Sequence, residues 1–340
     1  MELEGRILYG AEFEEREGRV IIEDGEITAI EEAPVASQDI VLPAFVNAHT
    51  HIGDSIAKEA GAGLSLDELV APPDGLKHRL LDAADRSELV AAMARTMRFM
   101  EHSGTAAFLE FREGGRDGVA AIRDAASERS VAPIVFGRGP ASVIEVADGY
   151  GASGARDGDF GDAREAARAA EKPFAIHAGE RDAADIDPAL ELDPDLLVHM
   201  VHADQEHLAA VEDAKIPVAV CPRSNLATDV GLPPVAALRE HTTVALGTDN
   251  VFLNSPSMFR EMEITQRCCD VSAREVLEMA TRTGAELLGR SDGLIEAGRP
   301  ANLIVLDGDT DNLAGAHDAV RAVVRRAGVA DVEEVLLPRT

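Results

Sequence analysis

The chain is short of lysine, of aromatic side chains and of positive charge. Lysine occurs only four times in 340 residues, tryptophan is absent, and aromatic residues make up 4% of the chain. The 32 basic residues are set against 62 acidic ones, which gives a formal net charge of −30. So negative a chain repels phosphate polymers and anionic lipid surfaces. We therefore expect neither nucleic acid nor a membrane as its main partner.

Cysteines and long apolar runs are also scarce. The three cysteines, Cys221, Cys268 and Cys269, are too few and too clustered for a disulfide framework, which points to a reducing compartment. No run of 18 uncharged apolar residues occurs, and the first residues lack a basic segment followed by an apolar one. These absences predict an unexported, soluble, cytoplasmic protein.

The acidic, lysine-poor composition is similar to that of proteins from salt-accumulating haloarchaea. In such cells, surface carboxylates stay hydrated although salt screens nearly all charge interactions. An ordinary acidic enzyme from a mesophile is the alternative. We expect a halophilic protein, and its 46% hydrophobic residues are enough for a sizeable core.

The middle of the chain alternates short apolar segments with alanine-rich amphipathic ones, which is typical of βα units. Eight strand candidates fall between residues 42 and 290: 46–52, 105–111, 132–138, 148–153, 174–180, 196–202, 217–222 and 243–249. This number and length predict a (β/α)8 TIM barrel over residues 43–292. An open doubly wound sheet is the competitor, but the glycine-rich turn typical of its nucleotide sites is absent.

Both ends of the chain have a different pattern. Residues 6–33 alternate apolar and polar side chains around Asp24-Gly25, which predicts a β-hairpin. Residues 293–309 and the valine-rich segment from 319 (AVRAVVRR) are also expected to form strands. The ends are therefore predicted to be strand-rich, unlike the middle.

Side chains of the types that bind metal ions in proteins recur where the predicted strands end. In a barrel, the active site lies at these strand ends. His49 and His51 alternate on the first strand and can face one cation together. His177 ends the fifth strand, His199 the sixth, and Asp249 the eighth. Four strand ends with such residues are hard to ascribe to coincidence.

The segments LPAFVNAHTH, HAGE, VHMVH, CPRSN and ALGTDN together resemble the amidohydrolase superfamily, in the branch of cytosine deaminase, adenosine deaminase and the triazine chlorohydrolases. The similarity covers nearly the whole chain, and its overall pattern looks most like the predicted chlorohydrolases of archaea. It implies that residues 1–42 and 293–340 form one small β-sandwich-like domain beside the barrel.

The resemblance also implies a ligand set. His49, His51, His177 and Asp249 would hold one divalent metal ion, with Zn2+ expected and Fe2+ or Mn2+ as alternatives. Family members with two metals bridge them by a carboxylated lysine from the fourth strand, and this chain has no lysine between Lys77 and Lys172. A mononuclear centre is therefore expected, with a glutamate bridge through Glu145 as the remaining alternative.

Catalytic roles follow from the same resemblance. Glu180 would protonate a ring nitrogen and pass the proton to departing ammonia, His199 would polarise the attacking hydroxide, and Asp249 would accept the proton of the attacking water. A salt bridge between Glu180 and Arg181 is the plain structural alternative. Cys221, among apolar strand neighbours, is expected to be a buried structural thiol.

Substrate residues are expected at the ends of the second and third strands and just beyond the first histidine pair. The candidates are Glu110, Arg112, Arg138 and Asp54. An arginine there can bind an anionic group bidentately or neutralise Glu110 in a structural ion pair, and both readings stay open. Residues 58–81 are expected to cover the mouth.

These patterns predict a mononuclear metal-dependent aminohydrolase acting on a nucleobase, nucleoside or related N-heterocycle. Hydrolysis of an amide or a carbon–halogen bond at the same site is the alternative. A barrel that binds its ligand without turnover is a remote third, because such a protein is expected to lack one or more ligands. The partner is a small-molecule substrate, and homo-oligomer formation is left open.

Overall fold

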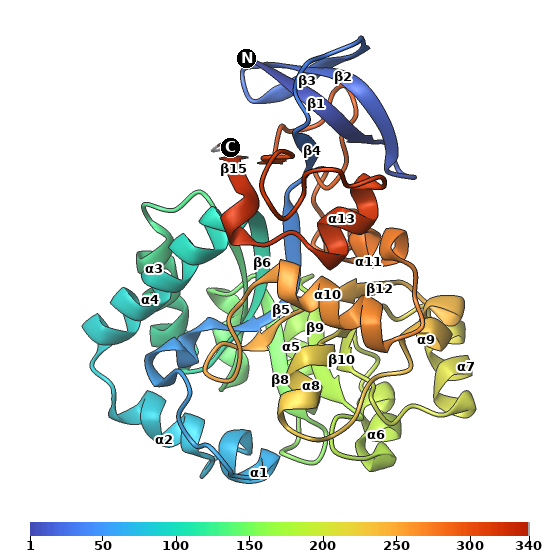
Figure 1. The fold of residues 1–340 in the computed structure, drawn as a ribbon. Coiled ribbons are helices and arrows are strands. Elements are labelled where there is room, and N and C mark those ends of the chain that lie inside the picture. The colour runs from blue at the N-terminus through green and yellow to red at the C-terminus, as the bar shows by residue number, and fades with distance from the viewer. Residues whose placement is uncertain (339–340) are drawn as a thin grey trace.

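Two β-sheets organise the chain in the computed structural model, which describes residues 1–338 (Figure 1). The smaller sheet combines strands from both ends of the chain, and the larger one takes its strands from the middle. In Figure 1 the blue and red ends meet at one pole of the molecule, and the larger sheet with its helices occupies the rest. The structure is therefore of the mixed α/β class.

The smaller sheet has six strands in the order β15-β14-β4-β1-β2-β3. Its strands are β1 (Glu2–Tyr9), β2 (Glu14–Glu23), β3 (Glu26–Glu32), β4 (Ile40–Pro43), β14 (Leu303–Leu306) and β15 (Val332–Leu336). Asp24 and Gly25 join β2 to β3 with positive φ angles of 49° and 81°, as a tight hairpin turn requires. The predicted hairpin is confirmed.

The larger sheet has nine parallel strands in the order β12-β11-β10-β9-β8-β7-β6-β5-β13. They are β5 (Phe45–His51), β6 (Thr105–Arg112), β7 (Ala132–Gly137), β8 (Gly149–Gly154), β9 (Phe174–Ala178), β10 (Leu196–His199), β11 (Val218–Val220), β12 (Val244–Leu246) and β13 (Asp249–Asn250). Each of the eight predicted strands is present. The last is divided, since β12 pairs with β11 whereas β13 pairs with β5.

Helices follow most of these strands and cover the larger sheet (Figure 1). They are α3 (Arg86–His102), α4 (Gly115–Ala126), α5 (Gly161–Ala169), α6 (Ile186–Glu191), α7 (Gln205–Ala214), α8 (Pro222–Ala227), α9 (Val235–His241), α10 (Met258–Cys268), α11 (Ala273–Ala280) and α12 (Arg282–Leu287). Two further helices, α1 (Leu66–Val70) and α2 (Leu76–Ala83), lie in the long connection after β5. No helix within residues 1–338 is long and apolar enough to cross a membrane.

The expected strand from residue 319 is wrong, because this segment forms the helix α13 (Ala319–Arg325). The Asp318 side chain accepts a hydrogen bond from the backbone N–H of Arg321 and caps the helix. Three valines then fall three and four residues apart and are buried, namely Val320, Val323 and Val324. Their helical spacing and the packing of α13 on α10 and α11 outweigh the preference of valine for strands.

Candidate metal centre and substrate cleft

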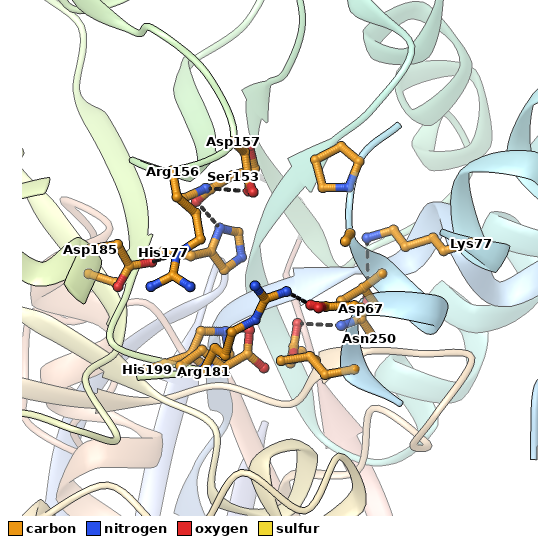
Figure 2. A pocket seen from close by; sticks show the side chains of 18 of the residues that line it. Asp67, Lys77, Ser153, Arg156, Asp157, His177, Arg181, Asp185, His199 and Asn250 are labelled. Atoms are coloured by element: carbon orange, nitrogen blue, oxygen red, sulfur yellow. Dashed lines mark hydrogen bonds and ion pairs between the residues drawn. The ribbon is translucent and has the colours of Figure 1, made fainter. Parts of the chain in front are cut away.

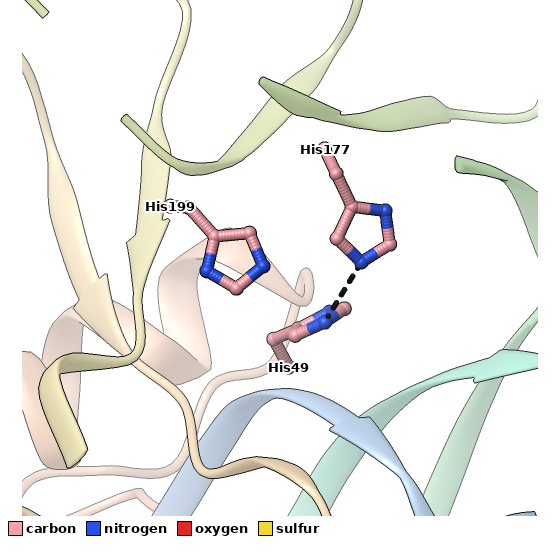
Figure 3. A group of neighbouring side chains, drawn as sticks. All are labelled: His49, His177 and His199. Atoms are coloured by element: carbon pink, nitrogen blue, oxygen red, sulfur yellow. Dashed lines mark hydrogen bonds between the residues drawn. The ribbon is translucent and has the colours of Figure 1, made fainter. Parts of the chain in front are cut away.

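The carboxyl ends of β5 and β9 and the start of β13 bring three imidazoles and a carboxylate to one point. His177 Nε2 lies 3.2 Å from His49 Nε2 and 3.3 Å from His51 Nε2. Asp249 Oδ1 lies 3.3 Å from His49 Nε2 and 3.6 Å from His51 Nε2. Figure 3 shows His49 and His177 turned toward each other from different strands. The structure thus brings together the four residues expected to be ligands.

The spacing and chemistry of these atoms fit a small divalent cation. A tetrahedral cation with bonds of about 2.0–2.1 Å holds its ligand atoms roughly 3.3 Å apart. His51 Nδ1 lies 3.1 Å from the Phe111 carbonyl and His177 Nδ1 lies 2.9 Å from the Ala152 carbonyl, so each Nδ1 donates and each Nε2 carries a lone pair. Lone pairs that face one another without a shared proton favour a cation between them.

Burial also keeps the imidazoles neutral, as metal ligands must be. Desolvation lowers the pKa of His51 to about 3 and is the largest cause, with the nearby Lys77 charge adding to it. Burial likewise lowers the pKa of His49, and it holds that of His177 well below its usual range. All three histidines therefore offer lone pairs at neutral pH.

Glu180 and His199 lie beside this cluster. Glu180 Oε2 is 3.6 Å from His199 Nε2, and both residues have a side-chain atom within 4.8 Å of one on Asp249. Burial raises the pKa of Glu180, against the opposing effect of His199. Arg181, the alternative partner considered for Glu180, forms an ion pair with Asp67 of α1.

The backbone at two of these residues is unusual. His199 has φ 79° and Asp249 has φ 58°, in the left-handed region that non-glycine residues rarely occupy. His199 is the last residue of β10, and Asp249 is the first residue of β13. Such conformations recur at functional sites, where the surrounding fold holds them in place.

Helix α8 contributes two consecutive polar residues. Ser224 Oγ donates to Asp249 Oδ2 at 2.6 Å, and Asn225 Nδ2 lies 3.1 Å from His199 Nδ1. Both side chains are fully buried. These contacts place the start of α8 beside the strand that bears Asp249. Cys221, just before the helix, is a buried free thiol as expected.

Sequence reasoning missed Glu113 and Lys77. Lys77 Nζ lies 2.7 Å from Glu113 Oε1, and the same oxygen is 3.1 Å from His51 Nδ1 and 3.0 Å from an Arg138 nitrogen. Burial alone would raise the pKa of Glu113, but Lys77, His51 and Arg138 hold it well below its usual range. The position of Glu113, directly after Arg112 at a predicted strand end, was the available signal.

Of the four expected substrate residues, one lines the cleft and three do not. Arg138 lines the cleft beside the metal-type cluster. Glu110 accepts hydrogen bonds from Thr50 Oγ1 and the Ile52 N–H, and burial raises its pKa to about 7. Arg112 lies 3.5 Å from Glu113, and Asp54 accepts from the Phe252 N–H. These three are buried among neighbouring side chains and do not belong to the cleft lining.

The residues considered for a two-metal centre are engaged elsewhere. Glu145 forms an exposed ion pair with Arg116. Lys172 Nζ donates to the carbonyls of Ile144 and Ala147, each at 2.7 Å. Neither side chain is directed to the cluster of His49, His51, His177 and Asp249.

The cluster opens into a cleft whose free space, counted to its mouth, is about 670 Å³ (Figure 2). One wall is apolar and comes from α1 and the turn after it, in agreement with the expected cover over the mouth. The remaining lining is charged and polar, and it includes Lys77, Arg138, Ser153, Arg156, Asp157, Glu180, Arg181, Asp185, His199 and Asn250.

Several known proteins are similar to this chain. The model of the amidohydrolase family matches residues 40–335. A protein of Methanothermobacter thermautotrophicus that carries the name aminohydrolase is 36% identical, over 89% of this chain and 90% of its own. The 5-methylthioadenosine/S-adenosylhomocysteine deaminase of Halobacterium salinarum is 28% identical, over 98% and 89%. Atrazine chlorohydrolase from Arthrobacter aurescens TC1, complexed with zinc, superposes with a TM-score of 0.83 at 18% identity, over 99% and 94%.

Proposed function

Because the chain belongs to the amidohydrolase family, we propose that it is a mononuclear metal-dependent aminohydrolase. It deaminates a nucleobase, a nucleoside or a related N-heterocycle and releases ammonia. The observation that carries this proposal is the convergence of three imidazole nitrogens and the Asp249 carboxylate, with Glu180 and His199 at its edge. The deaminase and aminohydrolase names of its relatives agree with it.

His49, His51, His177 and Asp249 would hold the metal ion. When bound, the cation would lower the pKa of a water molecule toward neutrality and so supply a nucleophile. Zinc is the proposed metal, because neutral imidazoles and a carboxylate suit it, and iron(II) and manganese(II) are the alternatives. The zinc complex of the chlorohydrolase neighbour is consistent with this choice.

The chain's own residues would move the protons. Asp249 would accept the proton of the attacking water. Glu180 would deliver its proton to a ring nitrogen, for which its raised pKa is suited, and would then take the proton of the added hydroxyl group and pass it to the departing ammonia. His199, 3.6 Å from Glu180, would donate a hydrogen bond to the oxygen that gains negative charge. Arg138 at the cleft wall would contact the substrate, with Glu110, Arg112 and Asp54 behind it.

We propose that the larger sheet closes as a (β/α)8 barrel. The pairing of β12 with β11 and of β13 with β5 supports closure, because both short strands belong to residues 244–250. We further propose two domains, the barrel of residues 43–292 and a small β-sandwich-like domain of 1–42 with 293–340. A separate apolar cluster supports that division, for its buried members all come from residues 3–41 and 295–305.

The net charge of −30 supports a halophilic protein, and we propose that it works in a salt-rich cytoplasm. The same charge disfavours nucleic acid and membrane partners. Its partner would be a small-molecule substrate held in the cleft.

The proposed activity is tested by screening purines, pyrimidines, their nucleosides and triazines for ammonia release at molar KCl, with the His177→Ala variant as blank. Ammonia from at least one heterocycle, absent from the blank, is expected. Hydrolysis of an amide or a carbon–halogen bond is the alternative function. A structural neighbour that is named an atrazine chlorohydrolase is the reason to test it. Chloride from chlorotriazines or amide cleavage, with no ammonia from any amine, would favour that alternative.

A further inference from the structure

His199 lies close enough to the cluster to be a metal ligand itself. One side-chain nitrogen from each of His49, His177 and His199 falls within 4.8 Å of the others, and the rings of His177 and His199 stack with centroids 5.3 Å apart (Figure 3). Distance alone therefore does not separate a donor histidine from the ligand histidines. Something else must keep the His199 imidazole out of the ligand set.

The Nδ1 partners of these histidines differ in kind. His51 Nδ1 and His177 Nδ1 face backbone carbonyl oxygens, which only accept hydrogen bonds. His199 Nδ1 faces the amide nitrogen of Asn225 at 3.1 Å, and an amide NH2 group only donates. With the amide in this orientation, its NH2 group toward the ring, His199 Nδ1 accepts, which leaves the His199 proton on Nε2. His51 and His177 have the opposite tautomer.

The other side of the His199 ring agrees with this assignment. Glu180 Oε2 lies 3.6 Å from His199 Nε2. A lone pair on Nε2 would repel the carboxylate, whereas an Nε2–H attracts it. Two neighbours on opposite sides of the ring therefore favour the same tautomer.

Asn225 is held firmly by its helix. On one side of it, the Arg223 N–H donates to the buried Glu261 at 2.9 Å, and the Arg223 guanidinium lies 3.1 Å from the same carboxylate. Next to it, Ser224 Oγ donates to Asp249 Oδ2. These contacts fix the start of α8 against α10 and β13, so the fully buried Asn225 side chain has little freedom to turn away from His199.

We infer that Asn225 is a positioning residue that holds His199 in the Nε2–H tautomer. A protonated Nε2 has no lone pair for a metal ion, so His199 stays outside the ligand set and points a hydrogen-bond donor into the cleft. Asn225 thereby keeps His199, unlike its three histidine neighbours, available to the substrate and not to the metal. This inference rests on the proposed metal centre.

Asn225→Asp provides the sharpest test, because it replaces an amide donor by a carboxylate acceptor of nearly the same shape. The acceptor draws the proton to Nδ1 and frees the Nε2 lone pair. We expect zinc affinity to be retained or increased as His199 joins the ligands, while turnover falls about 10- to 100-fold, the usual effect of altering a residue behind a metal site. Asn225→Ala should give a mixture of both His199 tautomers and a loss of turnover smaller than that of Asn225→Asp.

The tautomer is read directly by two-bond ¹H–¹⁵N NMR correlation on zinc-loaded protein with ¹⁵N-labelled histidine, with His199→Gln used to assign the signals. The wild type should show a protonated Nε2 at His199, and Asn225→Asp a protonated Nδ1. A protonated Nδ1 in the wild type would overturn the inference even if no variant folds. So would an Asn225→Asp protein in which Nε2 stays protonated.

Leu226→Ala is the matched control. Leu226 is on the same helix but 44% exposed, so its loss should leave the His199 tautomer, the zinc affinity and turnover unchanged. The tautomer needs no substrate to be observed. If no ammonia is released from any substrate but the tautomers respond as expected, the proposed function fails and this inference stands. If deamination is found but His199 in the wild type has the Nδ1–H tautomer, the proposed function stands and this inference fails.

Discussion

Lys77 Nζ lies 2.7 Å from Glu113 Oε1, and this buried ion pair joins helix α2 over the cleft to the strand end beside the metal-type cluster. Lys77 also donates to Asn250 Oδ1 at 3.1 Å, and Asn250 Nδ2 donates to Asp249 Oδ1 at 3.0 Å. One lysine therefore reaches both sides of the cluster, through Glu113 to His51 and through Asn250 to Asp249.

Replacing Lys77 by Met should loosen this connection. The variant keeps the length of the side chain but leaves Glu113 with less neutralising charge, although Arg138 stays 3.0 Å away. We expect a loss of about 3 kcal/mol in the free energy of unfolding and roughly tenfold weaker metal binding. Urea denaturation and chelator competition measure the two effects. Lys58→Met, an exposed lysine of the same connection, should change neither. Equal losses in both variants would contradict the assigned connection.

Glu180 and His177 should give opposite results when mutated. Glu180→Gln keeps the shape of the side chain but cannot carry a proton, so metal should stay bound while turnover falls about 10²- to 10⁴-fold. His177→Ala removes a nitrogen 3.2 Å from His49 Nε2 and should lose the metal itself. Elemental analysis with a turnover assay measures both. Metal-free Glu180→Gln, or His177→Ala with full metal content, would show that the assigned roles are wrong.

Glu110 should make stability depend on pH. Burial raises its pKa from the usual 4.5 to about 7. Between those values the folded state holds more protons than the unfolded state, so the free energy of unfolding falls as pH rises toward 7. Glu110→Gln removes this pH-dependent loss. The free energy of unfolding of the variant minus that of the wild type should therefore increase by about 2 kcal/mol from pH 5.5 to pH 8. Urea denaturation at both pH values measures it, with the exposed Glu12→Gln as control. A difference independent of pH would refute the assignment.

The parts of the site that could be predicted lie on regular strands. His49 and His51 alternate along β5, His177 lies next to the end of β9, and Asp249 follows β12, so period and order along the chain were enough to bring them together. Lys77 could not be found in this way. Its place depends on how an irregular connection folds back over the cleft, and no periodicity records that.

The local sequence pattern also gave a wrong secondary structure where tertiary packing determines it. The three valines of α13 favour a strand by propensity, yet the cap at Asp318 and the surface offered by α10 and α11 make a helix. The tautomer of His199 is a similar case. Asn225 follows Ser224 in the printed sequence, but only the folded chain places its amide nitrogen against the Nδ1 atom of a residue 26 positions away.

Salt should stabilise the folded protein through screening of its carboxylates. A formal charge of −30 repels itself most strongly at low ionic strength, and the Debye length shrinks from about 10 Å at 0.1 M salt to about 3 Å at 1 M. We expect the melting temperature to rise by roughly 10 °C between 0.1 and 2 M KCl, which calorimetry or circular dichroism measures. Sucrose of equal osmolality stabilises proteins by exclusion without screening, so it should give a smaller rise. An equal rise of the melting temperature in sucrose, or no rise in KCl, would contradict the proposal that this charge is an adaptation to a salt-rich cytoplasm.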